Sequence, residues 1–451
     1  MSRSLALLLL TLLAAAPARA QYFAFGKNKI QYESHDWAFV RTDHFDVYYY
    51  GEGYPLAAFA ATAAEDAYEQ IRDVLGHDLS RRVPILLYAG HRAFAATTAV
   101  DLPDDAQGIG GVTELFKNRV VLPFTGDYVE FRHVLHHELV HAVLNDQFYG
   151  GSVQAILQNN LRARLPIWLG EGLAEYAAQP WSTRSDAYLR DAVLSGTLPQ
   201  ASELNGFAAY WGGQAFFDFI VEQYGADKIS EVLSYLRTSR DLDAALRRAV
   251  GLDLAGLSER WHQSVRAVYF PEAAARVSLV ETAQPLVLPE SKSVFSSSPA
   301  LSPMGDRLAY VSSDGGTFGV YVVETRRGAR PRRVLAGQPS AQFEALRLLS
   351  PGLSWNGEGT HLAVAVTSGP DEAVAVVEVT TGETTLHPLP QIKQVIALAW
   401  HPSRDVLAVQ ASGASQSDLF LLYLPTADER ERLVRVTDDA LPENAPAWTP
   451  D

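Results

Sequence analysis

The spacing of apolar residues in the first part of the chain is strand-like in some segments and helix-like in others. The stretch "WAFVRTDHFDVYYY" at 37–50 is aromatic and β-branched with partial alternation, which predicts a strand pair that turns near Thr42. The Ala-rich stretch at 55–75 has helical spacing instead. Short apolar runs at 83–88 and 118–124 predict two further strands.

Beyond these strands the apolar spacing stays helical as far as about Phe270. The predicted helices are 129–148, 167–178, 184–194, 207–224, 227–238, 241–249 and 253–268. Gly225 is well placed to end the helix that begins at Phe207, because glycine is common just past a helix C-terminus. A mixed sheet followed by helices indicates an α+β fold.

Beyond about residue 271 the composition changes, and the rest of the chain contains sequence repeats. Residues 272–298 are rich in Pro and Ser, so we expect a linker there. The segments "ALSPMGDRLAY", "SWNGEGTHLAV", "AWHPSRDVLAV" and "AWTPD" align through Leu301, Trp355, Trp400 and Trp448, at spacings of 54, 45 and 48 residues. Each full unit carries a second strand pattern, "GVYVVE", "AVAVVEV" or "LFLLYL". Such repeats are typical of the blades of a β-propeller.

The "SP.GDRLAY" type of unit resembles the TolB-like propeller blades of bacterial cell-envelope proteins. The resemblance covers residues 299–451 and implies all-β repeats of about three blades. A propeller usually closes with about four to eight blades, because an open one leaves sheet edges exposed. We therefore expect residue 451 to be a truncation or a gene-model end.

The first twenty residues have the pattern of a signal peptide. Arg3 supplies the positive region, residues 5–15 the apolar region, and Ala18-Arg19-Ala20 the small-residue cleavage site. We expect the mature protein to start at Gln21 and to be exported to the periplasm or the cell exterior. No later run approaches the roughly 18 apolar residues that a spanning helix needs.

Composition limits the chemistry that the chain can carry. It has no cysteine, which excludes disulfides, thiolate ligands and a cysteine nucleophile, so that any metal must be held by His, Asp or Glu. The net charge is −15 and no basic stripe is present, so nucleic acid is not expected as a partner.

The stretch "FRHVLHHELVHAV" at 131–143 contains the metal-binding pattern H-E-x-x-H. His137 and His141 are four residues apart, so on a helix both imidazoles can reach one ion. Glu138 would point beside that ion, where it can take a proton from the attacking water. His133 is followed by Val134, so no acid stands in the position of the base. His136 lies about 100° around the helix from His137. We therefore expect both histidines to be packing or supporting residues.

A catalytic zinc needs a third protein ligand. One known pattern places a histidine six residues after His141, but that position is Gln147. The stretch "PIWLGEGLAEY" at 166–176 offers Glu171 and Glu175, four apart on one helical face. Taken alone, two such glutamates would more often be solvent-exposed residues that keep a surface helix soluble. Their position in a segment that begins 29 residues after the start of "HELVH" favours a role at a metal site instead.

These two motifs together resemble the gluzincin branch of zinc metallopeptidases, the peptidase MA group, in which H-E-x-x-H is followed by W-L-x-E-G-x-A. The resemblance implies that Glu171 is the third zinc ligand and that Glu175 orients a ligand histidine. Over residues 21–271 the chain looks like the bacterial secreted peptidase MA domain that is fused to TolB-like repeats. This implies a thermolysin-like zincin domain that holds one Zn²⁺ per chain.

The segment "GGVTELFKNRVVLPF" at 110–124 lies where gluzincin aminopeptidases carry a G-x-M-E-N substrate segment and an edge strand that pairs with substrate backbone. Here the chain has Val112, Thr113, Glu114 and Leu115, with no asparagine after the glutamate. The choice between endopeptidase and exopeptidase therefore stays open.

The resemblance implies peptide-bond hydrolysis with zinc held by His137, His141 and Glu171, and with Glu138 as the general base. The oxyanion needs one more donor. Tyr210 in "AAYWGGQAF" is the candidate and Tyr224 the next, although either is also a reasonable buried aromatic.

Two classes of function fit the sequence. The first is a secreted or periplasmic zinc metallopeptidase whose propeller binds peptide or protein substrates, or an envelope protein partner. The second is a cell-envelope propeller that acts as a binding or scaffold protein, with a vestigial or structural zinc domain. The intact Glu138 favours the enzyme, since a structural site needs no base beside the metal. Another amide or an ester is an open alternative to the peptide bond.

Overall fold

The structure is a computed structural model. The residues that it describes are 35–97, 110–115, 117–150, 165–274, 276–277, 282–287, 296–313, 318–337, 345–346, 352–368, 371–413, 415–425, 431–439, 441 and 443–449. The expected signal peptide at 1–20 and the expected mature start at Gln21 lie outside the described residues.

The first part of the chain contains a five-stranded mixed sheet. Its strands lie in the order β1-β2-β3-β5-β4. Their bounds are Trp37–Arg41 (β1), Phe45–Tyr50 (β2), Val83–Tyr88 (β3), Val112–Glu114 (β4) and Arg119–Pro123 (β5). The pairs β2–β3 and β3–β5 are parallel, whereas β1–β2 and β4–β5 are antiparallel. This confirms the predicted strand pair at 37–50, and it leaves the short strand β4 at one edge.

The helices follow the predicted segments closely, except for a short helix at 91–95 that was not predicted. Their bounds are Tyr54–Leu75 (α2), His91–Ala95 (α3), Tyr128–Tyr149 (α4), Ile167–Ala178 (α6), Thr183–Leu194 (α7), Phe207–Tyr224 (α8), Asp227–Ser239 (α9), Leu242–Val250 (α10) and Leu254–Ala274 (α11). The prediction was too short at α11, which continues through Pro271 and ends three residues later. Proline has no backbone N–H, so the helix lacks the hydrogen bond that position 271 would otherwise make to residue 267.

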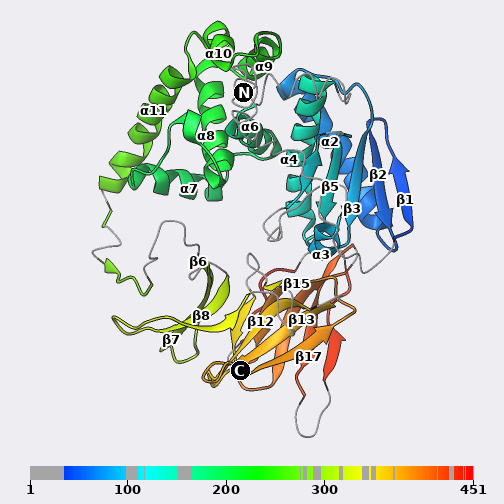
Figure 1. Ribbon diagram of the computed structural model, residues 1–451, viewed down its shortest axis with the longest axis vertical. Coiled ribbons are helices and arrows are strands. Elements are labelled where there is room, and N and C mark those ends of the chain that lie inside the picture. The colour runs from blue at the N-terminus through cyan, green and yellow to red at the C-terminus, as the bar shows by residue number, and fades with distance from the viewer. Residues whose placement is uncertain are drawn as a thin grey trace, which may run out of the picture.

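The main core lies between the mixed sheet and two long helices. Apolar residues of β2, β3 and β5 share one buried cluster with residues of α2 and α4, and helices α6 to α11 extend that cluster away from the sheet (Figure 1). The opposite face of the sheet is covered by α3, through Tyr88, Phe94 and Val121. The described helices include none that is long and apolar enough to cross a membrane.

Helices α6 and α8 approach each other at two glycines. A Cβ on Gly172 would lie 2.5 Å from the Cα of Gly213, and a Cβ on Gly213 would lie 2.9 Å from the carbonyl oxygen of Trp168. Only residues without a side chain allow two helix backbones to meet so closely. The crossing brings the middle of α8 beside the first half of α6.

Three antiparallel sheets form the C-terminal part (Figure 1). The first contains β6 (Ser296–Leu301), β7 (Arg307–Ser312), β8 (Gly319–Glu324) and β9 (Arg332–Ala336). The second contains β10 (Ala345–Leu346), β11 (Leu353–Trp355), β12 (His361–Ser368), β13 (Asp371–Glu378) and β14 (Thr384–Leu389). The third contains β15 (Gln394–Trp400), β16 (Val406–Ser412), β17 (Ser417–Tyr423) and β18 (Arg432–Arg435). The sheets match the three predicted repeats, while a propeller stays a prediction.

The aligned tryptophans make equivalent contacts between repeats. The indole nitrogen of Trp355 donates to the carbonyl oxygen of Ala300 at 2.9 Å, and that of Trp448 donates to Ala399 at 2.8 Å. In both cases the acceptor directly precedes the aligned residue of the preceding repeat. Apolar clusters fill the spaces between neighbouring sheets. Two of the three junctions between repeats therefore use the same hydrogen bond, whereas at the third the backbone nitrogen of Trp400 donates to the hydroxyl of Ser354 at 2.8 Å.

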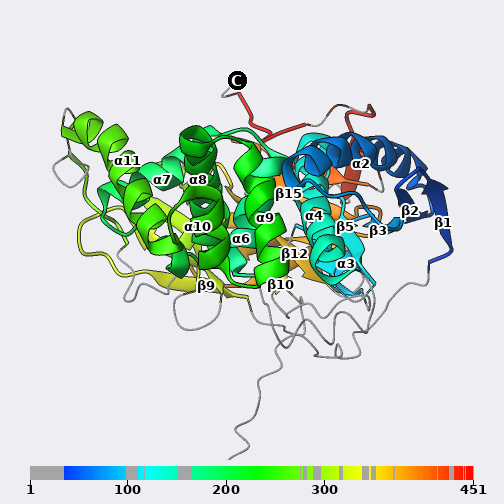
Figure 2. The ribbon, with the colours of Figure 1, turned by 90° about the horizontal axis from the view of Figure 1, so that it is seen from above.

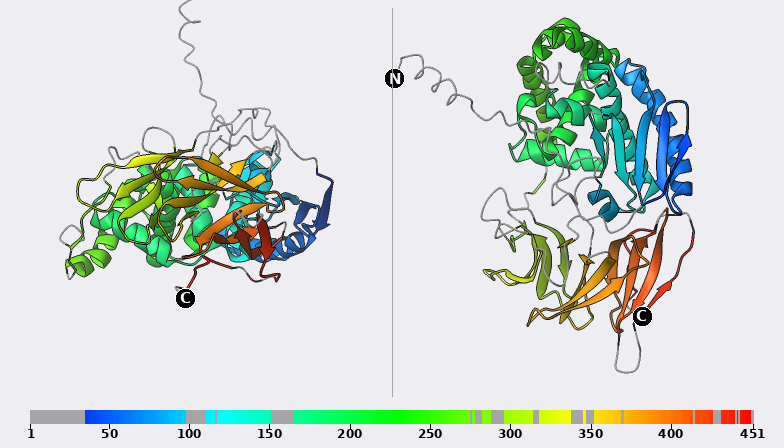
Figure 3. Two further views of the ribbon diagram at one scale, coloured as in Figure 1. Left: turned by 90° about the horizontal axis from the view of Figure 1, so that it is seen from below. Right: turned by 45° about the vertical axis from the view of Figure 1, so that its right-hand side comes forward.

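The third sheet also contacts the part of the chain that contains the mixed sheet, close to the start of α4 (Figures 2 and 3). The hydroxyl of Tyr128 donates to the carbonyl oxygen of Ser415 at 2.5 Å. Gly126 has a φ of 95°, and a Cβ there would lie 2.6 Å from the Cδ1 of Ile396. The helix that carries "HELVH" therefore begins at the contact between the two parts of the protein.

Asp218 in α8 gives a prediction about stability. Burial raises the pKa of Asp218 to about 6, and the negative charge of Glu222 adds to the effect. Its Oδ2 has no hydrogen-bond partner among the described residues. A raised pKa means that the folded state binds the proton more tightly than the unfolded chain, so this group destabilises the fold as the pH rises through about 6.

Replacing Asp218 with Asn is therefore expected to stabilise the protein above pH 7. A two-unit shift corresponds to at most about 3 kcal/mol, and partial exposure to solvent reduces this to roughly 1–2 kcal/mol. The free energy of unfolding, measured in urea at pH 8 and near pH 4, should rise at the higher pH only. An equal gain at both pH values would mean that the charge of Asp218 is not the cause.

Candidate metal centre

Helix α4 is capped at both ends and buries two of its four histidines, His136 and His137. The carboxylate of Asp127 accepts hydrogen bonds from the backbone nitrogens of Val129 and Glu130, and Gly150 ends the helix in a left-handed conformation. Between these ends "HELVH" occupies 137–141, and His137 and Glu138 are only 6% and 7% exposed. Such burial of polar groups requires partners within the protein.

Three of the predicted residues converge on one point. The Nε2 atoms of His137 and His141 lie 3.2 Å apart. The Oε2 atom of Glu171, which comes from α6, lies 3.2 Å from the first nitrogen and 3.3 Å from the second. Two nitrogens and one carboxylate oxygen thus form a nearly equilateral triangle.

The dimensions and chemistry of this triangle fit a zinc ion. Zinc binds histidine and carboxylate ligands at about 2.0–2.1 Å in tetrahedral geometry, which places ligand atoms about 3.3 Å from one another. Two histidines and one glutamate are also a known donor set of catalytic zinc sites, which keep a fourth position open. The structure therefore places His137, His141 and Glu171 where one zinc could be bound by all three.

The electrostatics of the site favour a cation. Burial alone would raise the pKa of Glu171, but the nearby imidazoles of His141 and His137 outweigh it and hold that pKa well below its usual value. For His137, burial acts to lower the pKa, and the carboxylates of Glu171 and Glu175 overcome it and raise the pKa. The carboxylates therefore draw positive charge toward this point.

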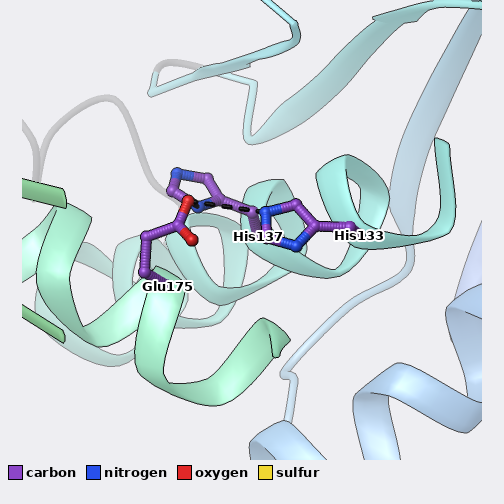
Figure 4. Close-up of side chains that lie close together, drawn as sticks. All are labelled: His133, His137 and Glu175. Carbon is purple, nitrogen blue, oxygen red and sulfur yellow. Dashed lines mark ion pairs between the residues drawn. The ribbon is translucent and has the colours of Figure 1, made fainter. Parts of the chain in front are cut away.

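Glu175 lies behind the first histidine. Its Oε1 atom is 3.1 Å from the Nδ1 of His137 and 3.5 Å from the Nε2 of His133 (Figure 4). Burial opposes ionisation of Glu175, but the hydrogen bond and charge of His137, with the charge of His133, hold its pKa below the usual value. A carboxylate on the far nitrogen of a ligand histidine fixes the orientation of its ring.

The same contacts create a second group of potential ligands. His133, His137 and Glu175 also lie close enough together to bind an ion, through the Nδ1 side of His137. The two groups share His137 and present its opposite nitrogens. Since one imidazole can orient on Glu175 while binding an ion through Nε2, the arrangement fits a metal at His137, His141 and Glu171 with Glu175 as its support.

Glu138 contacts the edge strand of the mixed sheet through its carboxylate. Its Oε2 atom accepts a hydrogen bond from the hydroxyl of Thr113 on β4 at 2.6 Å. The neighbouring Glu114 is engaged elsewhere, because its carboxylate accepts from the Nε of Arg119 at 3.0 Å. The edge strand predicted to bind substrate backbone therefore also contacts the predicted base.

Tyr210 lies at the site, whereas Tyr224 does not. The ring of Tyr210 stacks on that of His137 at 5.7 Å between centroids and 15° between planes. Burial raises the pKa of the Tyr210 phenol, and the negative charges of Glu171 and Glu138 raise it further, so the phenol keeps its proton. Tyr224 is about 21 Å farther along α8, where its hydroxyl accepts from Arg260.

The remaining predicted residues lie around this site. His136 is buried, and burial followed by the positive charges of His133 and Arg132 lowers its pKa to about 4, so it is neutral at pH 7. Gln147 donates its side-chain amide to the carbonyl oxygen of Leu75 and takes no part in the cluster. Neither lies among the described groups of potential metal ligands.

Sequence reasoning did not find three features of the site. It missed the bond from Thr113 to Glu138, the contact of His133 with Glu175, and the glycine crossing that brings Tyr210 to Glu171. The "GEG" and "WGG" stretches were the available signal for the crossing. Thr113 offered none, because its bond depends on how the sheet and α4 pack.

Comparison with known proteins finds a family model that matches part of the chain. Residues 63–267 match the family model described as "Peptidase MA superfamily". The match begins inside α2, ends inside α11 and covers a little under half of the chain. No curated protein matches the chain.

Solved structures give weaker likenesses. The M1 zinc metallopeptidase from Deinococcus radiodurans is 16% identical, with a TM-score of 0.30, over 51% of this chain and 51% of that chain. TolB from Acinetobacter baumannii is 12% identical, with a TM-score of 0.27, over 32% of this chain and 32% of that chain. The chain thus spans about half the length of the first structure and about a third of the second.

Proposed function

We propose that this protein is a zinc-dependent metallopeptidase. The observation that carries the proposal is the triangle of ligand atoms from His137, His141 and Glu171, with Glu138 beside it. The Peptidase MA superfamily match over residues 63–267 supports the same class. We further propose that the protein is exported, as the segment at 1–20 predicts, and acts in the periplasm or outside the cell.

Zinc, when bound by these three residues, would supply a Lewis acid that polarises the scissile carbonyl and activates water near neutral pH. Glu138 accepts the proton of the attacking water on its carboxylate and passes it to the nitrogen of the leaving amine. Glu175 fixes the ring of His137 through Nδ1. These side chains orient the reactants and move the proton.

Tyr210 is proposed as the donor to the oxyanion. Its phenol stays protonated near Glu171 and Glu138, so it can donate a hydrogen bond to a developing negative charge. Replacing Tyr210 with Phe is expected to lower kcat more than tenfold, on the order of other oxyanion donors, with little change in KM. Steady-state kinetics on one cleaved peptide would measure both constants, and an unchanged kcat would remove Tyr210 from the mechanism.

The C-terminal sheets are proposed to bind substrate or an envelope protein partner. A cavity of about 740 Å³ lies between the second and third sheets. Its polar and aromatic lining includes His361, Glu378, His387, Trp400, His401 and Arg404. The third sheet also contacts the start of α4, so binding there would take place on a surface attached to the helix of the metal site.

The function is tested on the purified protein. Elemental analysis should find about one zinc per chain, and a peptide library should be cleaved by the zinc-loaded protein but not after chelation. Readdition of zinc should restore cleavage. Zinc without cleavage of any peptide would favour the envelope binding or scaffold protein, and hydrolysis of simple esters or other amides alone would change the substrate class.

A further inference from the structure

Strand β4 contacts the side chain of Glu138 directly. The Oγ1 atom of Thr113 lies 2.6 Å from Oε2 of Glu138 and 2.9 Å from its carbonyl oxygen. A hydroxyl has one proton to donate, and the shorter contact to a carboxylate is the stronger bond. The hydroxyl of Thr113 is thus hydrogen-bonded to one of the two carboxylate oxygens of Glu138.

The strand is oriented so that this contact is built into the sheet. Side chains alternate between the two faces of a strand, so positions 111 and 113 share the face toward α4. Val112 points to the other face, where it packs against the cluster of Tyr88, Phe94 and Val121. Shifting the register of β4 by one residue would move Val112 out of this cluster and place it against Glu138. The packing of Val112 therefore also fixes the position of the Thr113 hydroxyl.

Gly111 allows the strand to come this close. A Cβ at position 111 would lie 2.5 Å from the Cδ2 of Leu122 and 3.0 Å from the Cγ of Glu138. Leu122 is fully buried and has little room to move. Gly111, which has no side chain, leaves the space that Glu138 occupies, and the hydroxyl of Thr113 binds the same glutamate from the same side of the strand.

We propose that Thr113 is the positioning residue of Glu138 and holds its carboxylate so that Oε1 is the oxygen that exchanges the proton. The proposal rests on the proposed function. The terminal torsion of a glutamate is broad, so an unrestrained carboxylate samples many orientations. The hydrogen bond from Thr113 to Oε2 selects one of these orientations. In that orientation Oε1 is the oxygen left to contact the reacting water. No bond is made or broken by Thr113 itself.

Two substitutions separate the hydroxyl from the shape of Thr113. Thr113→Val keeps the branched shape and removes the donor, and we expect kcat to fall about tenfold with KM and zinc content unchanged. Thr113→Ser keeps the donor and should retain most of the wild-type kcat. Thr62→Val, an exposed change on α2, is the matched control and should have no effect. A Ser variant as slow as the Val variant would overturn the proposal, as would a fully active Val variant.

A second measurement does not depend on activity. In crystal structures of the wild type and of Thr113→Val, we expect the Glu138 carboxylate to be fixed on Thr113 in the first and rotated or split between orientations in the second. The same carboxylate orientation in both would overturn the proposal. If the wild type cleaves no peptide, the proposed function fails, while this comparison still decides whether Thr113 positions Glu138.

Discussion

Replacing Glu138 with Gln is expected to lower kcat by roughly two to four orders of magnitude, the usual contribution of a general base. Gln has the same shape as Glu and can still accept a hydrogen bond from Thr113, which lies 2.6 Å from Oε2. Its amide cannot take a proton from water. The loss should therefore appear in kcat, with KM nearly unchanged and zinc still bound.

The position of Glu138 is the reason to expect zinc retention. Its carboxylate contacts the hydroxyl of Thr113, whereas the convergent ligand atoms belong to His137, His141 and Glu171. Removing its charge therefore leaves the ligand triangle complete. A substitution that destroyed the metal site would instead lower zinc content and activity together.

The measurement is a kinetic comparison on one cleaved peptide, with zinc determined in the same samples. Glu130→Gln is the matched control, because Glu130 lies on the same helix but is exposed in its first turn. We expect the control to cleave at the wild-type rate. A Glu138→Gln variant that kept both its zinc and its full kcat would exclude Glu138 as the base.

The parts of the fold that depend on local spacing could be read from the sequence. Helix α6 begins and ends where its apolar spacing and Pro166 predict. His137 and His141 share a face of α4 because they are one turn apart, and Glu171 and Glu175 share a face of α6 for the same reason. Local periodicity thus specified which side chains could act together on each helix.

The relation between helices could not be read in this way. Glu171 reaches the histidines because α6 packs on α4, and Tyr210 reaches Glu171 because α8 crosses α6 at Gly172 and Gly213. These are contacts between distant segments, and no single window of the sequence contains both partners. The resemblance to a family supplied Glu171, but it offered only a general candidate for the oxyanion donor.

His133 illustrates the same limit on α4 itself. Its spacing from His137 is that of a ligand pair, and the sequence argued against it only because Val134 stands where an acid would be needed. The structure places its Nε2 on Glu175, a residue of another helix. The four-residue spacing alone therefore could not distinguish the pair His133 and His137 from the pair His137 and His141 as metal ligands.

Removing one ligand of the proposed metal site is the second large expected effect. His141→Ala should abolish zinc binding, because the two remaining donors cannot make a three-ligand site. A ligand that binds only the folded state stabilises it by about 4 kcal/mol at a thousandfold excess over Kd. For a unit of about 250 residues, the size of the segment 21–271, that loss lowers Tm by roughly 10 °C.

His133→Ala is the control that separates the two overlapping groups of ligands. His133 lies 3.5 Å from Glu175 and belongs only to the second group, whereas His141 belongs only to the first. Zinc content and Tm, each measured with and without a chelator, should respond to zinc in His133→Ala and not in His141→Ala. Because both changes remove one imidazole from the same helix, a general loss of packing would affect them alike. The reverse outcome would place the metal on His133, His137 and Glu175, and would leave Glu171 free of the metal.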